Sequence, residues 1–131
     1  MPGRLVALLL LGLPAAAAPA DEAIDLEAKL KESAETSPLA GKMMLQLIDL
    51  YWIDEQVFGL IRTATKFSRS QPDHPRRAEV MLKLKDGYAV TARHEDVVTT
   101  GRQFLELFPG HRLTIAARDR LATAFERTGR T

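Results

Sequence analysis

An internal repeat of 37 residues runs through this chain. A fixed period of roughly 20 to 50 residues is typical of units that cannot bury their apolar side alone and must stack on their neighbours. The sequence therefore predicts a row of stacked units. The residues that coincide after the shift are Pro38 with Pro75, Tyr51 with Tyr88, Phe67 with Phe104, Pro72 with Pro109 and His74 with His111, while Leu47, Leu84 and Leu121 share one register and Phe125 takes the third tyrosine place.

Each unit carries apolar side chains at the spacing of a helix that faces a core. In the first unit this stripe consists of Met44, Leu47, Ile48 and Tyr51, which recur at i, i+3, i+4 and i+7. Ser37 before Pro38 predicts an N-cap followed by a first-turn proline, whose fixed φ and missing N–H suit that place. We expect a second helix from about residue 55 to residue 68, with Asp54 as its cap and Pro72 closing the unit.

The second unit repeats this plan, and a third is begun. Pro75 is expected to open a helix, and a second helix follows Arg93 and runs to Pro109, with His94 and two acids in its first turn. The third unit supplies one helix over about residues 113–127, and residues 21–34 suit a capping helix. Because no segment of useful length alternates with the period of a strand, the predicted fold class is all α.

The first twenty residues resemble a secretory signal peptide. Arg4 is a short positive region, residues 5–13 are almost entirely aliphatic, and the segment that ends at Ala20 has the small-x-small pattern of a cleavage site. We therefore expect a periplasmic or secreted protein cleaved after Ala20, without stable membrane insertion afterwards. An uncleaved anchor is the alternative, although the apolar run is shorter than the roughly 20 residues that span a bilayer. The chain has no cysteine, so packing alone must hold it together.

Charge is balanced in the expected mature chain. Without Arg4, the 18 Lys and Arg of the full sequence fall to the number of Asp and Glu, 17. No overall field favours nucleic acid. Residues 21–61 are mainly acidic and residues 62–131 mainly basic. Either this is a chance difference between solvated helix faces, or the two ends attract head to tail or steer charged partners.

The spacing of the apolar, aromatic and proline residues within each unit resembles that of the tetratricopeptide repeat. The positions that carry the resemblance are Leu84, Tyr88, Val97, Phe104 and Pro109, together with Leu121, Phe125 and the turn at residues 128–130. The usual period of that family is 34, and the three extra residues here follow each closing proline. The lengthened form, with Phe-Leu-Glu-Leu-Phe-Pro at residues 104–109, is similar to repeats in bacterial periplasmic Tol-Pal coordinators and in helper lipoproteins of outer-membrane protein assembly.

This resemblance implies a right-handed solenoid of antiparallel helix pairs and a soluble envelope adaptor that binds another protein or a peptide. The implied units are residues 38–74, 75–111 and a half unit at 112–131, preceded by a capping helix and linker at 21–37. Two features depart from the bacterial examples: there is no cysteine to carry a lipid, and residues 21–37 are too short for the long coiled coil of the Tol-Pal coordinators.

A stacked row of helix pairs leaves the first helix of each pair on its concave side. A groove that mixes aromatic, aliphatic and charged groups suits an extended peptide or a partner helix. The alternative is that Trp52 fills the core and that the charged positions are simply solvated. The groove candidates are Lys42, Leu45, Asp49 and Trp52 in the first unit, Glu79, Leu82 and Asp86 in the second, and Asp119 and Glu126 in the third.

Other chemistries find little support in the sequence. His74 and His111 lie one repeat apart, too far for a shared metal ion, so no metal or cofactor is expected. The sequence contains no His-Glu-x-x-His pair, Gly-rich phosphate loop or Gly-x-Ser-x-Gly elbow, and adjacent acids such as Glu95 and Asp96 are explained by helix capping. Three hypotheses remain: an exported protein-binding adaptor, a structural or self-assembling envelope element, and an enzyme or enzyme-regulatory subunit.

Overall fold

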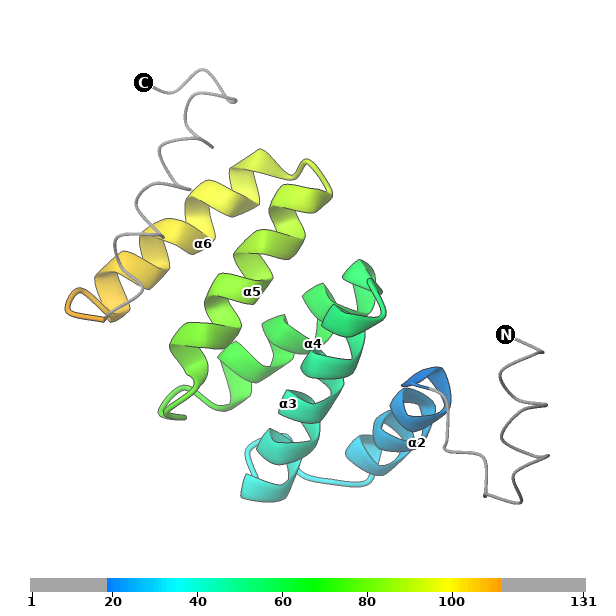
Figure 1. Cartoon of the computed structure of the whole chain (residues 1–131). Helices are drawn as coiled ribbons and strands as arrows, with labels where there is room; N and C mark the ends of the chain where they lie inside the picture. The colour runs from blue at the N-terminus through cyan, green and yellow to red at the C-terminus, as the bar shows by residue number, and fades with distance from the viewer. Residues whose placement is uncertain (1–18, 112–131) are drawn as a thin grey trace.

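The computed structural model describes residues 19–111, and every regular element in that range is an α-helix (Figure 1). The predicted all-α class is confirmed for this part of the chain. The helices are α2 (Pro19–Lys31), α3 (Pro38–Ile53), α4 (Val57–Ser70), α5 (Arg77–Val90) and α6 (His94–Leu107).

Each helix packs against the next one along the chain, from α2 to α6. Successive helices run in opposite directions (Figure 1). One edge of the array therefore holds the start of α2, the end of α3, the start of α4, the end of α5 and the start of α6. We call it the turn edge, because the short α3–α4 and α5–α6 turns lie on it.

The start of α3 has the N-cap and the first-turn proline that the sequence predicts. The Ser37 hydroxyl accepts a hydrogen bond from the Ala40 N–H at 3.1 Å, and Pro38 occupies the first turn. The cap satisfies an N–H that has no partner within the helix, and the proline has no N–H to satisfy. This N-terminus was predicted correctly because its signals lie within four residues of one another.

Two predicted helix starts are wrong. Asp54 does not cap the second helix, because it is the C-cap of α3, and α4 begins only at Val57, with Gln56 before it. Glu55, the residue between, has a left-handed backbone with φ of 56°, which reverses the chain. Similarly, Pro75 precedes α5 instead of opening it, since α5 begins at Arg77.

The two short turns have the same backbone conformation 37 residues apart. Glu55 and Ala92 are the non-glycine residues with positive φ in the described chain, at 56° and 57°. In each turn the next residue donates its N–H to the carbonyl of the tyrosine five residues earlier. These bonds run from Gln56 to Tyr51 and from Arg93 to Tyr88, at 2.9 Å in both cases.

The same agreement holds for the buried aromatic residues near the other ends of α4 and α6. Phe67 and Phe104 are both completely buried. Each makes a T-shaped ring contact with a histidine seven residues later: His74 lies 5.0 Å from Phe67 and His111 lies 6.0 Å from Phe104, centroid to centroid. The two histidines are therefore packing residues of the turns.

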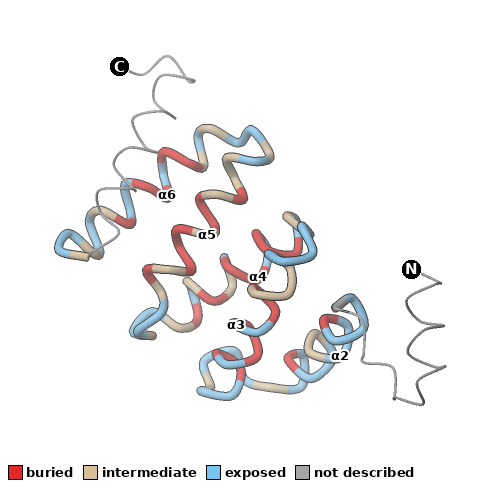
Figure 2. The backbone as a smooth tube through the Cα atoms, viewed as in Figure 1, coloured by how far each residue is buried: buried red, intermediate tan, exposed pale blue. Residues whose placement is uncertain are grey.

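The main core joins four helices. Its buried residues come from α2, α3, α4 and α5, and smaller clusters join α5 to α6. Leu47 and Leu84, which share a register in the sequence, both belong to this core. In Figure 2 buried residues concentrate along α3, α4 and α5, whereas α2 is mostly exposed and contributes Ala23 and Leu30.

Several predictions concern residues outside the described range. Residues 1–18 of the predicted signal peptide at 1–20, and the predicted third unit at 112–131 with Asp119, Leu121, Phe125 and Glu126, lie there. The predicted cleavage point after Ala20 falls in the first turn of α2. Within residues 19–111, none of the helices has both the length and the apolar character needed to cross a bilayer.

The left-handed residue at Ala92 gives a stability prediction. A non-glycine residue at positive φ is strained by about 1 kcal/mol, which glycine avoids. We expect Ala92→Gly to leave the free energy of unfolding in urea unchanged or to raise it by up to about 1 kcal/mol. Ala28→Gly, at an exposed position within α2, should lower it by about 1 kcal/mol. Equal losses in the two variants would contradict the left-handed turn.

Candidate functional site

A cavity of about 560 Å³ opens on the turn edge between the α3–α4 turn and the end of α5. We call it the Trp52 cavity. Trp52, in the last turn of α3, is 46% exposed, so its indole remains available to a partner. The residues that line the cavity are Tyr51, Trp52, Glu55, Val57, Leu60, Asp86, Gly87 and Val90.

The backbone brings these residues together. The left-handed Glu55 folds the start of α4 back beside the end of α3, which places Val57 near Trp52. On the other wall, α5 approaches α4 closely at Gly87: a Cβ built there would lie 3.0 Å from Cγ1 of Ile61. Because glycine has no side chain, this helix can pack tightly while the cavity above it stays open.

A cross-helix ion pair borders the cavity. The Lys83 ammonium of α5 donates to Oδ1 of Asp49 on α3 at 3.0 Å. The same ammonium lies 5.8 Å from the centroid of the Trp52 ring, within the range of a cation–π contact. Lys83 thus ties two helices together and holds a positive charge near the indole. The exposed carboxylate of Glu55 contributes negative charge at the rim.

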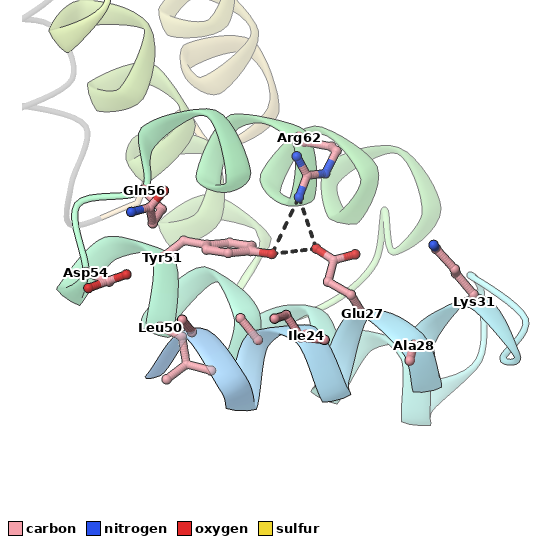
Figure 3. A pocket seen from close by; sticks show the side chains of 11 residues that line it. Ile24, Glu27, Ala28, Lys31, Leu50, Tyr51, Asp54, Gln56 and Arg62 are labelled. Carbon is pink, nitrogen blue, oxygen red and sulfur yellow. Dashed lines mark hydrogen bonds and ion pairs between the residues drawn. The ribbon is translucent and has the colours of Figure 1, made fainter. Parts of the chain in front are cut away.

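A second cavity, of about 580 Å³, lies between α2 and the α3–α4 turn (Figure 3). We call it the Tyr51 cavity. The hydroxyl of Tyr51 donates to Oε1 of Glu27 at 2.6 Å, and Nη2 of Arg62 donates to the same oxygen at 3.2 Å. The three side chains, from α2, α3 and α4, point toward one another (Figure 3). Tyr51 lines both cavities and so separates them.

The network shifts the pKa values of its members in opposite directions. Burial by itself raises the pKa of the Glu27 carboxyl, but the hydrogen bonds from Tyr51 and Arg62 and the charges of Arg62 and Lys66 bring it below its ordinary value of 4.5. Burial, followed by the bond to Glu27 and its charge, raises the pKa of Tyr51 to about 12. At neutral pH, Glu27 is therefore a carboxylate that accepts from a protonated phenol and from a guanidinium.

The Tyr51 ring itself is held by a glycine. A Cβ built at Gly59 of α4 would lie 3.0 Å from three atoms of that ring, so the aromatic face rests directly on the α4 backbone. This contact fixes the direction in which the hydroxyl points. Tyr88, the equivalent residue of α5, has the Arg93 guanidinium 4.6 Å from its ring centroid, closer than the 5.9 Å between Arg62 and the Tyr51 ring.

The structure brings together three of the predicted groove residues. Asp49 and Trp52 meet through Lys83, and Asp86 lines the same cavity as Trp52. Lys42 is exposed on α3 and lines none of the cavities described. Glu79 is half-buried and pairs with Arg76, the residue just before α5, Oε2 to Nε, at 3.4 Å.

The two predicted aliphatic groove residues contribute to the core instead. Leu82 is 8% exposed and packs with Met81 and Phe104, which removes it from the surface that a partner meets. Leu45 is half-buried against the main core.

The sequence did not indicate Lys83, Glu55 or Val90 as site residues. Lys83 lies 34 positions from Asp49, and only the folded chain brings the two side chains together. Glu55 was placed inside a helix by the spacing of apolar residues, which carries no sign of a left-handed turn. Val90 carries a usable signal, because it coincides with Ile53 after the 37-residue shift, and both are more than 70% exposed.

Among residues 19–111 no group of three or more histidine or acidic side chains is arranged to hold a metal ion. Both cavities combine apolar walls with a few charged groups, an arrangement suited to holding a side chain or a small apolar group. Comparison with protein-family models, with curated proteins and with solved structures returned no match to this chain. The residues of the site are therefore the basis for assigning a function.

Removing the hydroxyl of Tyr51, and separately that of Tyr88, tests whether the bond to Glu27 stabilises the fold. We expect Tyr51→Phe to lower the free energy of unfolding by about 1–2 kcal/mol, because a hydrogen bond to a charged acceptor is lost. Tyr88→Phe should change it by less than about 0.5 kcal/mol. Urea unfolding measures both, and amide exchange should show faster opening of α2 in Tyr51→Phe alone. Equal effects of the two substitutions would rule out the proposed anchoring of α2.

The lowered pKa of Glu27 leads us to expect that the stability of the fold depends on pH. Because its folded pKa is depressed, its contribution to stability is present above its ordinary pKa of 4.5 and is lost as the pH falls through the folded value. The stability difference between the native chain and Glu27→Gln should be largest at neutral pH and shrink in acid. Urea unfolding from pH 7 to pH 3 measures it, and a constant difference over that range would contradict the network.

Proposed function

We propose that this protein is an exported adaptor that binds a peptide segment or another envelope protein through the Trp52 cavity. The observation that carries the proposal is a half-exposed tryptophan at an apolar cavity bordered by charged groups. Tryptophan is enriched among the residues that dominate binding energy, especially where it lies in a pocket. The charged groups nearby would set the orientation and the choice of partner.

The proposal includes a tetratricopeptide-like architecture with a 37-residue period. Support comes from the paired turns, with left-handed residues at 55 and 92 and matching hydrogen bonds, and from the equivalent burial of Phe67 and Phe104. Under this proposal α2 occupies the place of the second helix of a preceding unit. Its buried Ala23 and Leu30 fall 37 residues before Leu60 and Phe67. The array is then a short solenoid with a polar helix at one end, as terminal caps require.

Export is the part of the proposal that rests on sequence alone. The charged start, aliphatic run and small-residue site of the first twenty residues support it. The absence of cysteine from the chain means that export would bring no disulfide, and the core of α3, α4 and α5 must supply the stability.

The test is capture of partners by the purified chain from envelope extracts, with matched surface variants. Trp52→Ala should weaken capture of a specific partner at least about tenfold. Leu39→Ala removes a 60% exposed leucine at the opposite edge of the array and should leave capture unchanged. Circular dichroism should show that both variants are folded. A partner held equally by the two variants would refute the Trp52 cavity as the binding site.

A further inference from the structure

We infer that the partner segment is cationic and amphipathic, and that it lies along the turn edge with an apolar side chain in the Trp52 cavity. This inference rests on the proposed function and specifies the chemistry of the partner. Two independent properties of the turn edge support it: the exposed apolar side chains gather there, and so does negative charge.

Large apolar side chains are exposed unevenly over the described helices. Seven are exposed within residues 19–111, and only Leu39 and Leu107 lie at the opposite edge. A row of such groups at one edge marks an interaction surface, whereas single exposed apolar residues do not. Those on the turn edge are Ile24 of α2, Trp52 and Ile53 of α3, Phe58 of α4 and Val90 of α5, with exposed fractions of 69%, 46%, 73%, 72% and 77%.

The surface between these side chains is hollowed. The Tyr51 cavity includes Ile24, and the Trp52 cavity includes Trp52 and Val90. A third cavity, of about 380 Å³ between α2 and α3, includes Ile53. Four of the five exposed apolar groups therefore line recesses into which side chains of a bound segment can fit, and Phe58 is exposed outside them.

Acidic residues dominate the helix halves that form the turn edge, residues 19–25, 46–63 and 84–100. Among the basic residues of these halves, Arg62 and Arg93 are in ion pairs with Glu27 and Asp96, and Lys85 is buried. The Lys83 ammonium also reaches this edge, where it pairs with Asp49, so the excess of acidic over basic groups there is smaller by one. The acidic residues are Asp21, Glu22, Asp25, Asp49, Asp54, Glu55, Asp86, Glu95 and Asp96, against the basic residues Arg62, Lys85 and Arg93.

The opposite edge is weakly basic. Residues 26–45, 64–83 and 101–111 hold nine Lys and Arg against six Asp and Glu, and the excess lies in residues 64–83. The charge separation therefore runs across the array from edge to edge. The negative charge of the turn edge would repel an anionic lipid surface. It would attract a segment that carries Lys or Arg beside apolar residues.

The probe is a synthetic amphipathic peptide of leucine and lysine, about 18 residues or roughly five helical turns long, with a leucine and glutamate peptide as its charge-reversed control. Fluorescence anisotropy of the labelled peptides measures binding to the full chain. We expect the lysine peptide to bind at least about tenfold more tightly than the glutamate peptide, with an affinity that falls as salt rises.

Matched variants separate the turn edge from general charge effects. Glu55→Lys should weaken binding of the lysine peptide about three- to tenfold, whereas Asp73→Lys, the same charge change at the opposite edge, should alter it less than about twofold. Phe58→Ala should weaken binding about fivefold, while Leu39→Ala should leave it unchanged. Equal effects within either pair, or equal binding of the two peptides, would overturn the inference.

Two further outcomes would also overturn it. Binding of the chain to anionic phospholipid vesicles that is weakened by Phe58→Ala would make the edge a membrane contact. Self-association that is weakened by Glu55→Lys, measured by sedimentation, would make the occupant a second copy, whose residues 112–131 are themselves basic. If Trp52→Ala abolishes partner capture while the lysine peptide fails to bind, the partner chemistry is wrong and the proposed function stands.

Discussion

The structure depends on the burial of one apolar stripe per helix against the next helix in the chain. Phe67 of α4 and Phe104 of α6 are the largest apolar side chains that are fully buried in these stripes. Because α4 contacts both α3 and α5, its stripe serves two neighbours, and the main core extends without a break from α2 to α5. No cysteine reinforces this packing, so the contacts between successive helices have to hold the array together.

This mode of packing also determines where a site can form. Antiparallel helices cover one another along their middles, but their ends and the short turns receive less cover. At the turn edge the left-handed residues 55 and 92 keep the turns short, and the last side chains of α3 and α5 remain exposed. Trp52 and Val90 therefore border a recess instead of filling the core. The same edge also carries the hydrogen bonds from Tyr51 and Arg62 to Glu27, which connect α2 to α3 and α4.

The sequence predicted what depends on neighbouring residues. The helical class, the Ser37 cap and the acidic first turn of α6 all follow from signals a few positions apart. Asp54 was assigned to the start of α4, although it is the C-cap of α3. The two positions can be told apart only if the left-handed turn at Glu55 is recognised, and the sequence pattern does not show that turn. Leu82 was expected in a groove, but Phe104, 22 positions later, covers it. The sequence shows a charge asymmetry between residues 21–61 and 62–131, whereas the difference between the two edges arises only when the helices pack antiparallel.

The most direct measurement of the proposed architecture is the thermal unfolding of a chain in which residues 57–93, one complete period, are duplicated in tandem. If the helix pairs are equivalent units of a solenoid, the extra pair finds matching surfaces on both sides. The chain should then gain helix content in proportion to its length and unfold cooperatively at an equal or higher Tm. Duplication of residues 60–93, three residues short of the period, should instead lower the Tm. A cooperative transition that is lost in the full-period duplication, or equal behaviour of the two chains, would contradict the account.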